Sequence, residues 1–216
     1  MQLPDNVTPL EPVRPEGDRA WNERKKERTR GTLLEAAVRL MAERGVGAVT
    51  VNDIVTEASV APGTFYNYFS SHEALVDELV QAMVDMVGEV NAGRKQARDP
   101  GSRLARVLRG HLARATLEPG FTRLLVRVAA QGSGPVRDAL VRGIEDDIID
   151  GIGKGQFTAE ADEAALDLVL GALLQGLQRV ADGHVRRDYH HALVANVLRG
   201  LGMVSAAALE RAQRGI

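Results

Sequence analysis

The chain has 216 residues, of which 44% are hydrophobic and 26% charged, and its formal net charge at pH 7 is -2. These proportions are typical of a globular protein and exclude a chain that is mostly disordered. The absence of cysteine excludes disulfide bonds, a thiolate nucleophile and a thiolate metal site.

The N-terminal segment predicts neither a membrane anchor nor a folded element. No apolar run in the chain approaches the roughly 20 residues that a membrane-spanning helix needs, and the first 20 residues lack the apolar stretch of a secretory signal. We therefore expect a cytoplasmic protein without a membrane partner. The prolines of this segment and its scattered polar side chains predict a disordered tail over residues 1–20.

Positive charge is concentrated in one place. Residues 19–30 contain six Lys or Arg residues and two Glu residues, a local net charge of +4, whereas residues 45–72 contain no Lys or Arg. Such a basic run is either the solvated start of a helix or an arm that neutralises nucleic-acid phosphates.

Two short helices are predicted after this basic segment and a first amphipathic helix. Apolar residues recur at helical spacing over residues 33–41, and Gly45 is a suitable end for that helix. Thr50 and Asp53 have the spacing of a capping box, which predicts a short helix over residues 51–58.

The second short helix is predicted over residues 62–69, because Pro62 is favoured at a first helical position. The two short helices, each of about two turns, and the three-residue turn between them form a candidate helix-turn-helix. On a helical wheel, Phe65 and Phe69 face a core. The opposite side suits a DNA major groove, because small residues and an amide lie between two phenols: Gly63, Thr64, Asn67, Tyr66 and Tyr68. The residues alone leave open that this helix belongs to a core or a protein interface.

The remainder of the chain is predicted to be helical as well. Stretches with helical periodicity are separated by turns that contain Gly or Pro, and no strand-like alternation occurs. We expect an all-α protein with three short N-terminal helices and about six or seven longer ones. A helix-turn-helix domain over residues 21–72 is joined by a long helix to a larger helical domain over residues 73–216.

The segments from Ala36 to Gly45 and from Thr50 to Leu75 resemble the DNA-binding domain of the TetR family of transcriptional regulators, in register and without a gap. The resemblance implies a homodimeric repressor that binds a palindromic double-stranded DNA operator. It also implies that the larger domain holds an effector pocket and a dimer interface, so that a small molecule releases the repressor.

The resemblance also implies a set of DNA contacts. Thr50, Tyr66 and Tyr68 are expected at the phosphate backbone. The base pairs are expected to face Pro62, Gly63, Thr64 and Asn67. Together with the basic arm, the expected DNA-binding residues are Lys25, Lys26, Arg28, Arg30, Thr50, Pro62, Gly63, Thr64, Tyr66, Asn67, Tyr68 and His72.

Three positions depart from the usual family pattern. Ser59 replaces a common glycine and Ala61 a common serine, and we expect both changes to have little effect. His72 replaces a common lysine and weakens one phosphate anchor, because a free imidazole is mostly uncharged at neutral pH.

In the larger domain, polar or soft residues on apolar stripes are the candidates for the wall of a pocket for a mostly apolar effector: Met83, Met86, His111, Phe121 and Gln131. Residues 164–182 and 189–203 are apolar on more than one face, which predicts burial on more than one side. Either these helices form a four-helix dimer interface, as in the resembled family, or they belong to one large core of a single chain. The candidate residues of the dimer interface are Leu173, Gly176, Leu177, Leu193, Val197 and Leu201.

No motif points to an enzyme, a cofactor or a metal. Residues 151–155 lack the spacing of a phosphate-binding loop, and the three histidines between residues 184 and 191 lie in a polar turn. Two alternatives remain open: a regulator that needs no effector or acts as an activator, and an interaction module that has kept the fold without binding DNA.

Overall fold

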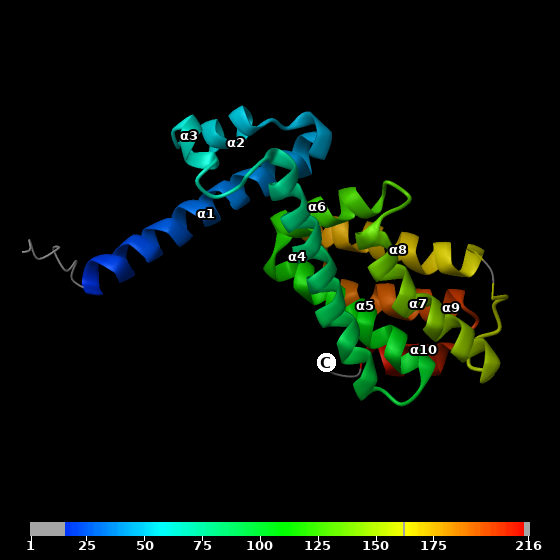
Figure 1. Cartoon of the computed structure of the whole chain (residues 1–216). Coiled ribbons are helices and arrows are strands. Elements are labelled where there is room, and N and C mark those ends of the chain that lie inside the picture. The colour runs from blue at the N-terminus through cyan, green and yellow to red at the C-terminus, as the bar shows by residue number, and fades with distance from the viewer. Residues whose placement is uncertain (1–15, 162, 214–216) are drawn as a thin grey trace, which may run out of the picture.

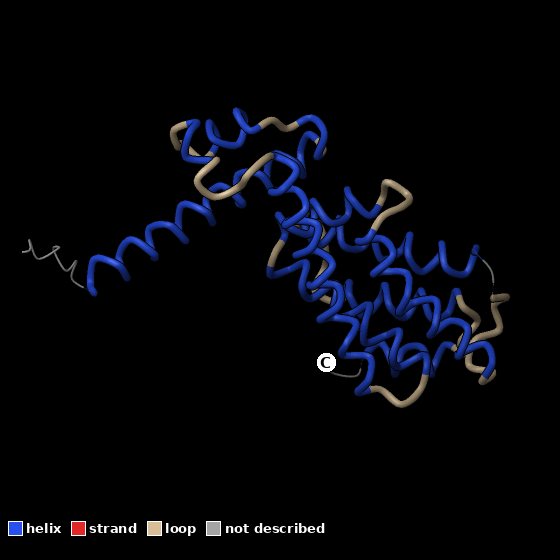
Figure 2. Tube along the Cα trace, in the orientation of Figure 1, coloured by secondary structure: helices blue, strands red, loops and turns tan. Residues whose placement is uncertain are grey.

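The structure, a computed structural model, describes residues 16–161 and 163–213, and most of them lie in helices (Figure 2). This part of the chain contains no strand, which confirms the all-α prediction. Three N-terminal helices form one unit, and α4 leads from it into a larger bundle (Figure 1). The helices are α1 (Glu16–Arg44), α2 (Val51–Glu57), α3 (Pro62–Phe65), α4 (His72–Ala92), α5 (Pro100–Leu117), α6 (Pro119–Ala129), α7 (Pro135–Gly153), α8 (Glu163–Ala181), α9 (Tyr189–Gly200) and α10 (Ser205–Gln213).

Helix α1 is much longer than predicted. It has 29 residues, so the first helix is not short, and residues 16–20 are helical rather than part of a disordered tail. Residues 1–15 of the predicted tail lie outside the described residues. The sequence explains the length, because good helix formers such as Glu, Arg and Lys dominate residues 16–30 and no proline interrupts them. The first half of α1 projects away from the rest of the molecule (Figure 1).

The second half of α1 is the centre of the N-terminal unit. Leu33, Ala37 and Met41 are completely buried, and α1 packs against α2, α4 and α6. The repeat of apolar residues over 33–41 therefore faces a core, as predicted.

Helix α6 of the bundle also holds the end of α1. The Arg127 guanidinium donates to the backbone carbonyls of Ala42 and Glu43, with N···O distances of 3.2 and 3.3 Å. These carbonyls belong to the last turn of α1, where no intrahelical N–H remains to bond them. Gly45 then ends the helix with a φ of 96°, a conformation that glycine adopts without strain. The two parts of the molecule are thus joined by a specific cap as well as by packing.

The larger bundle is built around α5, which packs against α7, α8, α9 and α10. Its residues Leu104, Leu108 and Leu112 are buried at the centre of this domain. Helix α8 lies beside α5, α6, α7 and α9.

Helix α8 combines length with an apolar composition. Among the described residues, it is the one helix whose length and hydropathy would suit a membrane span, yet it packs against four other helices. A core helix meets the same criterion. Only 44% of its most apolar window is buried, so one face of α8 remains uncovered in the single chain.

The predicted dimer-interface residues mostly lie on the other, buried face. This corrects the interface assignment, because five of them are packed inside the single chain: Leu173, Gly176, Leu177, Val197 and Leu201. Leu193 is partly buried against the same core. At Gly176 a Cβ would lie 2.4 Å from Cδ2 of Leu193, so α8 and α9 approach closely there. The leucine stripes are the intramolecular contacts of α8 and α9, and sequence periodicity does not distinguish such contacts from a dimer seam.

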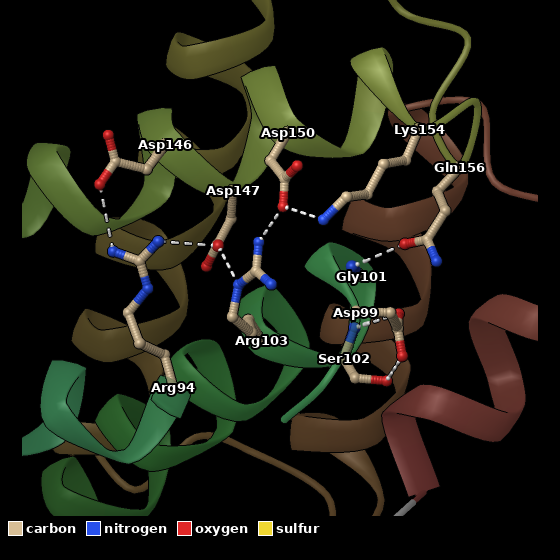
Figure 3. A network of polar contacts seen from close by, with 10 residues as sticks. All are labelled: Arg94, Asp99, Gly101, Ser102, Arg103, Asp146, Asp147, Asp150, Lys154 and Gln156. Carbon is tan, nitrogen blue, oxygen red and sulfur yellow. Dashed lines mark hydrogen bonds and ion pairs between the residues drawn. The ribbon is translucent and has the colours of Figure 1, made fainter. Parts of the chain in front are cut away.

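A buried ion-pair network links helices of the larger bundle (Figure 3). The Asp147 side chain on α7 has no exposed surface, and its Oδ1 accepts from Arg94 at 2.8 Å and from Arg103 at 2.6 Å. Arg94 belongs to the short helix η2 (Gly93–Gln96), which follows α4. The network therefore joins the end of α4 to α5 and α7. Removing one partner of such a buried pair typically costs about 3–5 kcal/mol, because the other charge is left unpaired.

Candidate nucleic-acid interface

Helix α2 begins with the predicted capping box. The Thr50 hydroxyl accepts from the Asp53 backbone N–H at 3.2 Å, and the Asp53 carboxylate accepts from the Thr50 backbone N–H at 2.8 Å. Hydrogen bonds from the side chain and backbone of Thr50, together with the charge of Arg44, lower the pKa of Asp53. The Thr50 hydroxyl also donates to Asp53 at 2.5 Å, so it would have to exchange partners to bind a phosphate.

The turn after α2 depends on a left-handed residue that is not glycine. Ser59 has a φ of 54° and is the one non-glycine residue with a positive φ in the described chain. The Ser59 N–H donates to the Thr56 carbonyl at 3.1 Å and the Val60 N–H to the Val55 carbonyl at 3.0 Å. These are the two bonds of a Schellman motif, in which glycine is the usual left-handed residue. The expectation that serine changes little here stays a prediction, and the left-handed conformation sets against it a cost of about 1–2 kcal/mol in stability.

Helix α3 is shorter than predicted. Pro62 is its first residue, as expected, but the helix ends at Phe65 rather than at Phe69. The N–H groups of Asn67 and Tyr68 bond the carbonyls three residues earlier, at 3.2 and 2.9 Å. This tighter spacing is the 3₁₀ pattern that often ends a short helix.

The two faces of this segment divide as the helical wheel predicted. Phe65 and Phe69 are buried with ring centroids 5.4 Å apart, whereas Tyr66 is 62% exposed. Pro62, Gly63 and Asn67 are also exposed, and Thr64 and Tyr68 are half-buried. The structure thus brings the predicted base-reading groups together on one open surface. A Cβ added at Gly63 would meet no protein atom within 4 Å, so the fold itself does not require glycine there.

The basic arm is helical, and its last arginine is already engaged. Lys25, Lys26 and Arg28 are exposed on the projecting half of α1. Arg30, in contrast, forms an ion pair with Glu78 of α4, and its guanidinium carbon lies 5.3 Å from the centre of the Phe69 ring. Arg30 therefore supports α4 and the core beneath α3 in the free protein, and its contact with a DNA phosphate stays a prediction. A partner 48 residues away leaves no signal in the local sequence.

His72 is also placed differently from the prediction. It is the first residue of α4, and Ser71 caps that helix by accepting from the Ala74 N–H at 3.2 Å. The His72 Nε2 atom is buried and has no hydrogen-bond partner among the described residues. In this conformation that nitrogen does not reach a DNA phosphate.

An apolar-lined cavity lies where the N-terminal unit meets the bundle. It has a volume of about 770 Å³ and is walled by α1, α4, the end of α5 and the start of α6. Its apolar lining comes from three helices: Leu34, Val38 and Ala42 on α1, Leu79, Ala82 and Met86 on α4, and Phe121 on α6. Sequence reasoning missed the contribution of α1, because its half-buried residues look like part of the domain core.

Two of the five predicted pocket residues, Met86 and Phe121, line this cavity. The other three do not. Met83 is part of the core, and Gln131 is exposed in the turn after α6. His111 is buried with its Nε2 atom 3.3 Å from Oδ1 of Asn91, and burial lowers its pKa to about 4, so the ring is neutral at pH 7. Met83 and His111 lie on apolar stripes that fill the core, whereas α6 ends at Ala129, before Gln131.

An exposed α3 positioned by α2, with small and amide-bearing groups on its open side, defines a helix-turn-helix of the DNA-binding class. Residues 33–79 match the family model described as bacterial regulatory proteins of the tetR family. The HTH-type transcriptional repressor KstR2 of Rhodococcus jostii is 30% identical over 178 residues, which cover 82% of this chain and 77% of that relative. The chain belongs to the TetR family of bacterial regulatory proteins.

Two further similarities are confined to a part of the chain or concern its structure. The KstR2 repressor of Mycobacterium tuberculosis is 46% identical over 56 residues, which cover 26% of this chain and 28% of that relative. At 46% identity, the matched segment of this chain therefore spans little more than a quarter of that repressor's length. The crystal structure of RolR with its ligand resorcinol has a TM-score of 0.55 and 28% identity, and covers 90% of this chain and 97% of that one.

Replacing Ser59 with Gly is expected to raise the free energy of unfolding by about 0.5–1 kcal/mol. Glycine relieves the left-handed strain but adds entropy to the unfolded chain, so part of the gain is offset. Denaturant titration measures the change. The control is Ser59→Ala, which keeps the Cβ and should give no gain. An equal gain from alanine would show that strain at this turn is not the cause.

Proposed function

We propose that the protein is a homodimeric repressor that binds a palindromic operator and is released from it by a small, mostly apolar effector. The observation that carries this proposal is the position of the 770 Å³ cavity. One wall is α1, which supports the helix-turn-helix, and the opposite walls are α4 and α6. Its volume falls within the range of about 300–1,000 Å³ that is usual for small-molecule sites. We further infer a cytoplasmic, non-catalytic role.

The two kinds of DNA contact would come from different parts of the chain. Thr64 and Asn67 would read base edges, and Gly63 would let the backbone approach the groove closely. No Lys or Arg occurs over residues 45–72, so the electrostatic part of binding must come largely from the arm. On a helix, Arg24 and Arg28 share one face while Lys26 points elsewhere, so the arm residues contribute unequally.

Replacing Arg28 or Lys25 with Ala should weaken binding to operator and random duplex alike. The slope of log K against log salt should fall by roughly one unit for each phosphate that the variant no longer neutralises. Thr64→Ala and Asn67→Ala should instead cost about 1–3 kcal/mol on the operator alone and relax the preference at one base position. Binding isotherms across a salt series, on an operator obtained by selection from random DNA, measure both effects. Failure of that selection to enrich a palindrome would contradict operator binding altogether.

Arg30→Ala is the matched control within the arm. Because Arg30 already pairs with Glu78, its replacement should lower the free energy of unfolding. The salt slope should change less than it does in Arg28→Ala. A slope change as large as that of Arg28→Ala would show that the ion pair opens on DNA.

The effector would act by changing how α1 sits on the bundle. A ligand in the cavity contacts α1 directly, and the Arg127 cap joins the same helix to α6. A ligand that favours one arrangement of these helices over the other must shift the operator affinity. By linkage, operator DNA shifts the affinity for that ligand by the same factor. The bound resorcinol in RolR supports a small-molecule role for this architecture.

Filling the cavity should uncouple ligand and DNA. Ala82 lines the cavity from α4, so Ala82→Phe should abolish the response to compounds that a thermal-shift screen selects on the wild type. Operator affinity without ligand should change by less than about threefold, because the reading surface is untouched. The neighbouring exposed Gln81 does not line the cavity, and Gln81→Phe is the control. A full response in Ala82→Phe would place the effector elsewhere.

The uncovered face of α8 and α9 is the surface that we assign to the dimer. On α8 it consists of Ala164, Leu168, Gly171 and Gln175, and on α9 of Ala192, Asn196 and Gly200. A Cβ at Gly200 would lie 2.8 Å from Cδ2 of Leu168, so the two helices present one continuous surface. Small residues let a second pair of helices approach closely, and an exposed, mostly apolar face favours a second copy as its cover.

In solution the protein should have a mass of about 47 kDa, twice the 23.3 kDa of one chain. Gly171→Glu should shift it to the monomer at micromolar concentration, because each copy would bury a charge at a cost of about 2 kcal/mol or more. Gly171 has open space within the chain, as does the exposed Gly88 on α4, and Gly88→Glu is the control. Light scattering distinguishes the species. A dimeric Gly171→Glu variant would rule out this face.

A further inference from the structure

A second, smaller cavity in the bundle is dominated by arginine. It has a volume of about 390 Å³ and lies between the segment that follows α4, the first half of α5, and α10. Four of its lining residues are arginines and one is an aspartate: Arg98, Arg106, Arg109, Arg211 and Asp99. None of its lining residues belongs to the 770 Å³ cavity.

Arg109 is the unusual member of this group. It is only 6% exposed, and its Nη1 donates to the backbone carbonyl of Arg211. Its Nε is buried without a hydrogen-bond partner, and no carboxylate pairs with its guanidinium in the described part of the chain. Burial and the nearby charge of Arg106 lower its pKa, but arginine remains charged in proteins. A buried, unpaired cation is costly, so it needs an anion or another function to account for it.

The single carboxylate of the cavity is already committed to other groups. Asp99 caps α5 by accepting from the Ser102 N–H at 3.0 Å, and it accepts from Arg211 at 3.1 Å. Although burial alone would raise its pKa, the bonds from Ser102 and Arg211 lower the pKa of Asp99 to about 2. Arg106 donates to the neutral amide oxygen of Gln96. Positive charge therefore exceeds negative charge by three among the lining residues.

We propose that this cavity binds the phosphate group of a small molecule. Guanidinium groups present paired N–H donors that match phosphate oxygens. Several guanidinium groups around one cavity suit a phosphate dianion as ligand better than they suit a ligand with a single carboxylate. The Arg109 Nε would gain the acceptor that the chain does not supply. The volume also exceeds the need of inorganic phosphate, since one water occupies about 30 Å³ of liquid. The cavity thus has room for an organic part of the ligand.

The test is calorimetric and thermal titration of the full-length protein with inorganic phosphate, at an ionic strength held constant with NaCl. Wild-type protein should bind saturably, and its Tm should rise with phosphate. In Arg109→Met the phosphate-dependent rise should disappear, while the Tm without phosphate should stay equal or increase, because an unpaired buried charge has been removed. Arg98→Gln, a surface change, should weaken binding about tenfold. Arg142→Gln, on an exposed part of α7, is the control and should bind normally.

Several outcomes would contradict the proposal, and a comparison of two ligands would identify the source of the phosphate. No saturable binding beyond the NaCl control, or an unchanged phosphate shift in Arg109→Met, would overturn it. If Arg109→Met does not fold, normal binding by both Arg98→Gln and Arg106→Gln would overturn it in the same way. Citrate binding as tightly as phosphate would overturn the assignment to phosphate. Tighter binding of ribose 5-phosphate than of inorganic phosphate would support an organic ligand, whereas equal binding would support free phosphate.

Discussion

The contact between α1 and α6 determines how the helix-turn-helix is presented. Arg127 bonds two backbone carbonyls at the end of α1, so this cap does not depend on which side chains α1 carries there. The same helix supplies the buried centre of the N-terminal unit and one wall of the large cavity. Ion pairs from Arg39 to Glu57 and from Arg44 to Asp53 join α1 to α2. A shift of α1 on the bundle therefore moves the whole reading surface with it.

The elements that the sequence predicts correctly are those that depend on neighbouring residues. The capping box of Thr50 and Asp53, the proline at the start of α3 and the inward side of Phe65 and Phe69 follow from spacing within a few residues. Each of these features has the same physical cause in an isolated segment as in the folded chain.

The errors concern contacts between distant segments. Arg30 looks like a free charge in the sequence because Glu78 lies 48 residues away, and the stripe of Leu173 looks alike whether α5 or a second chain covers it. His111 is misplaced in a pocket for the same reason, whereas Gln131 is misplaced because α6 ends before it. Periodicity identifies the apolar side of a helix but not the element that packs on it. The left-handed turn at Ser59 is a different case, because its strain is local but only the observed φ reveals it.

Two buried charged side chains in the bundle, Asp147 and Arg109, differ in whether the chain supplies a partner of opposite charge. Asp147 is fully buried, yet two arginines from different elements compensate it, so the network is explained by the fold alone (Figure 3). Arg109 is nearly as buried and has only a backbone carbonyl. The two sites have similar depth, and each keeps one buried atom without a partner among the described residues, Oδ2 of Asp147 and Nε of Arg109. The presence of an opposite charge, rather than burial, therefore distinguishes the two sites.

The projecting half of α1 also gives the molecule an uneven distribution of charge. Residues 19–30 carry a net charge of +4 in a chain whose total is -2, so the remainder carries -6. DNA attracts the arm and repels the body. A diffusing molecule is therefore turned before contact, with the arm and the adjacent α3 leading. Such steering accelerates productive encounters and fades as salt screens the field, so the helical arm influences the rate of association as well as its strength.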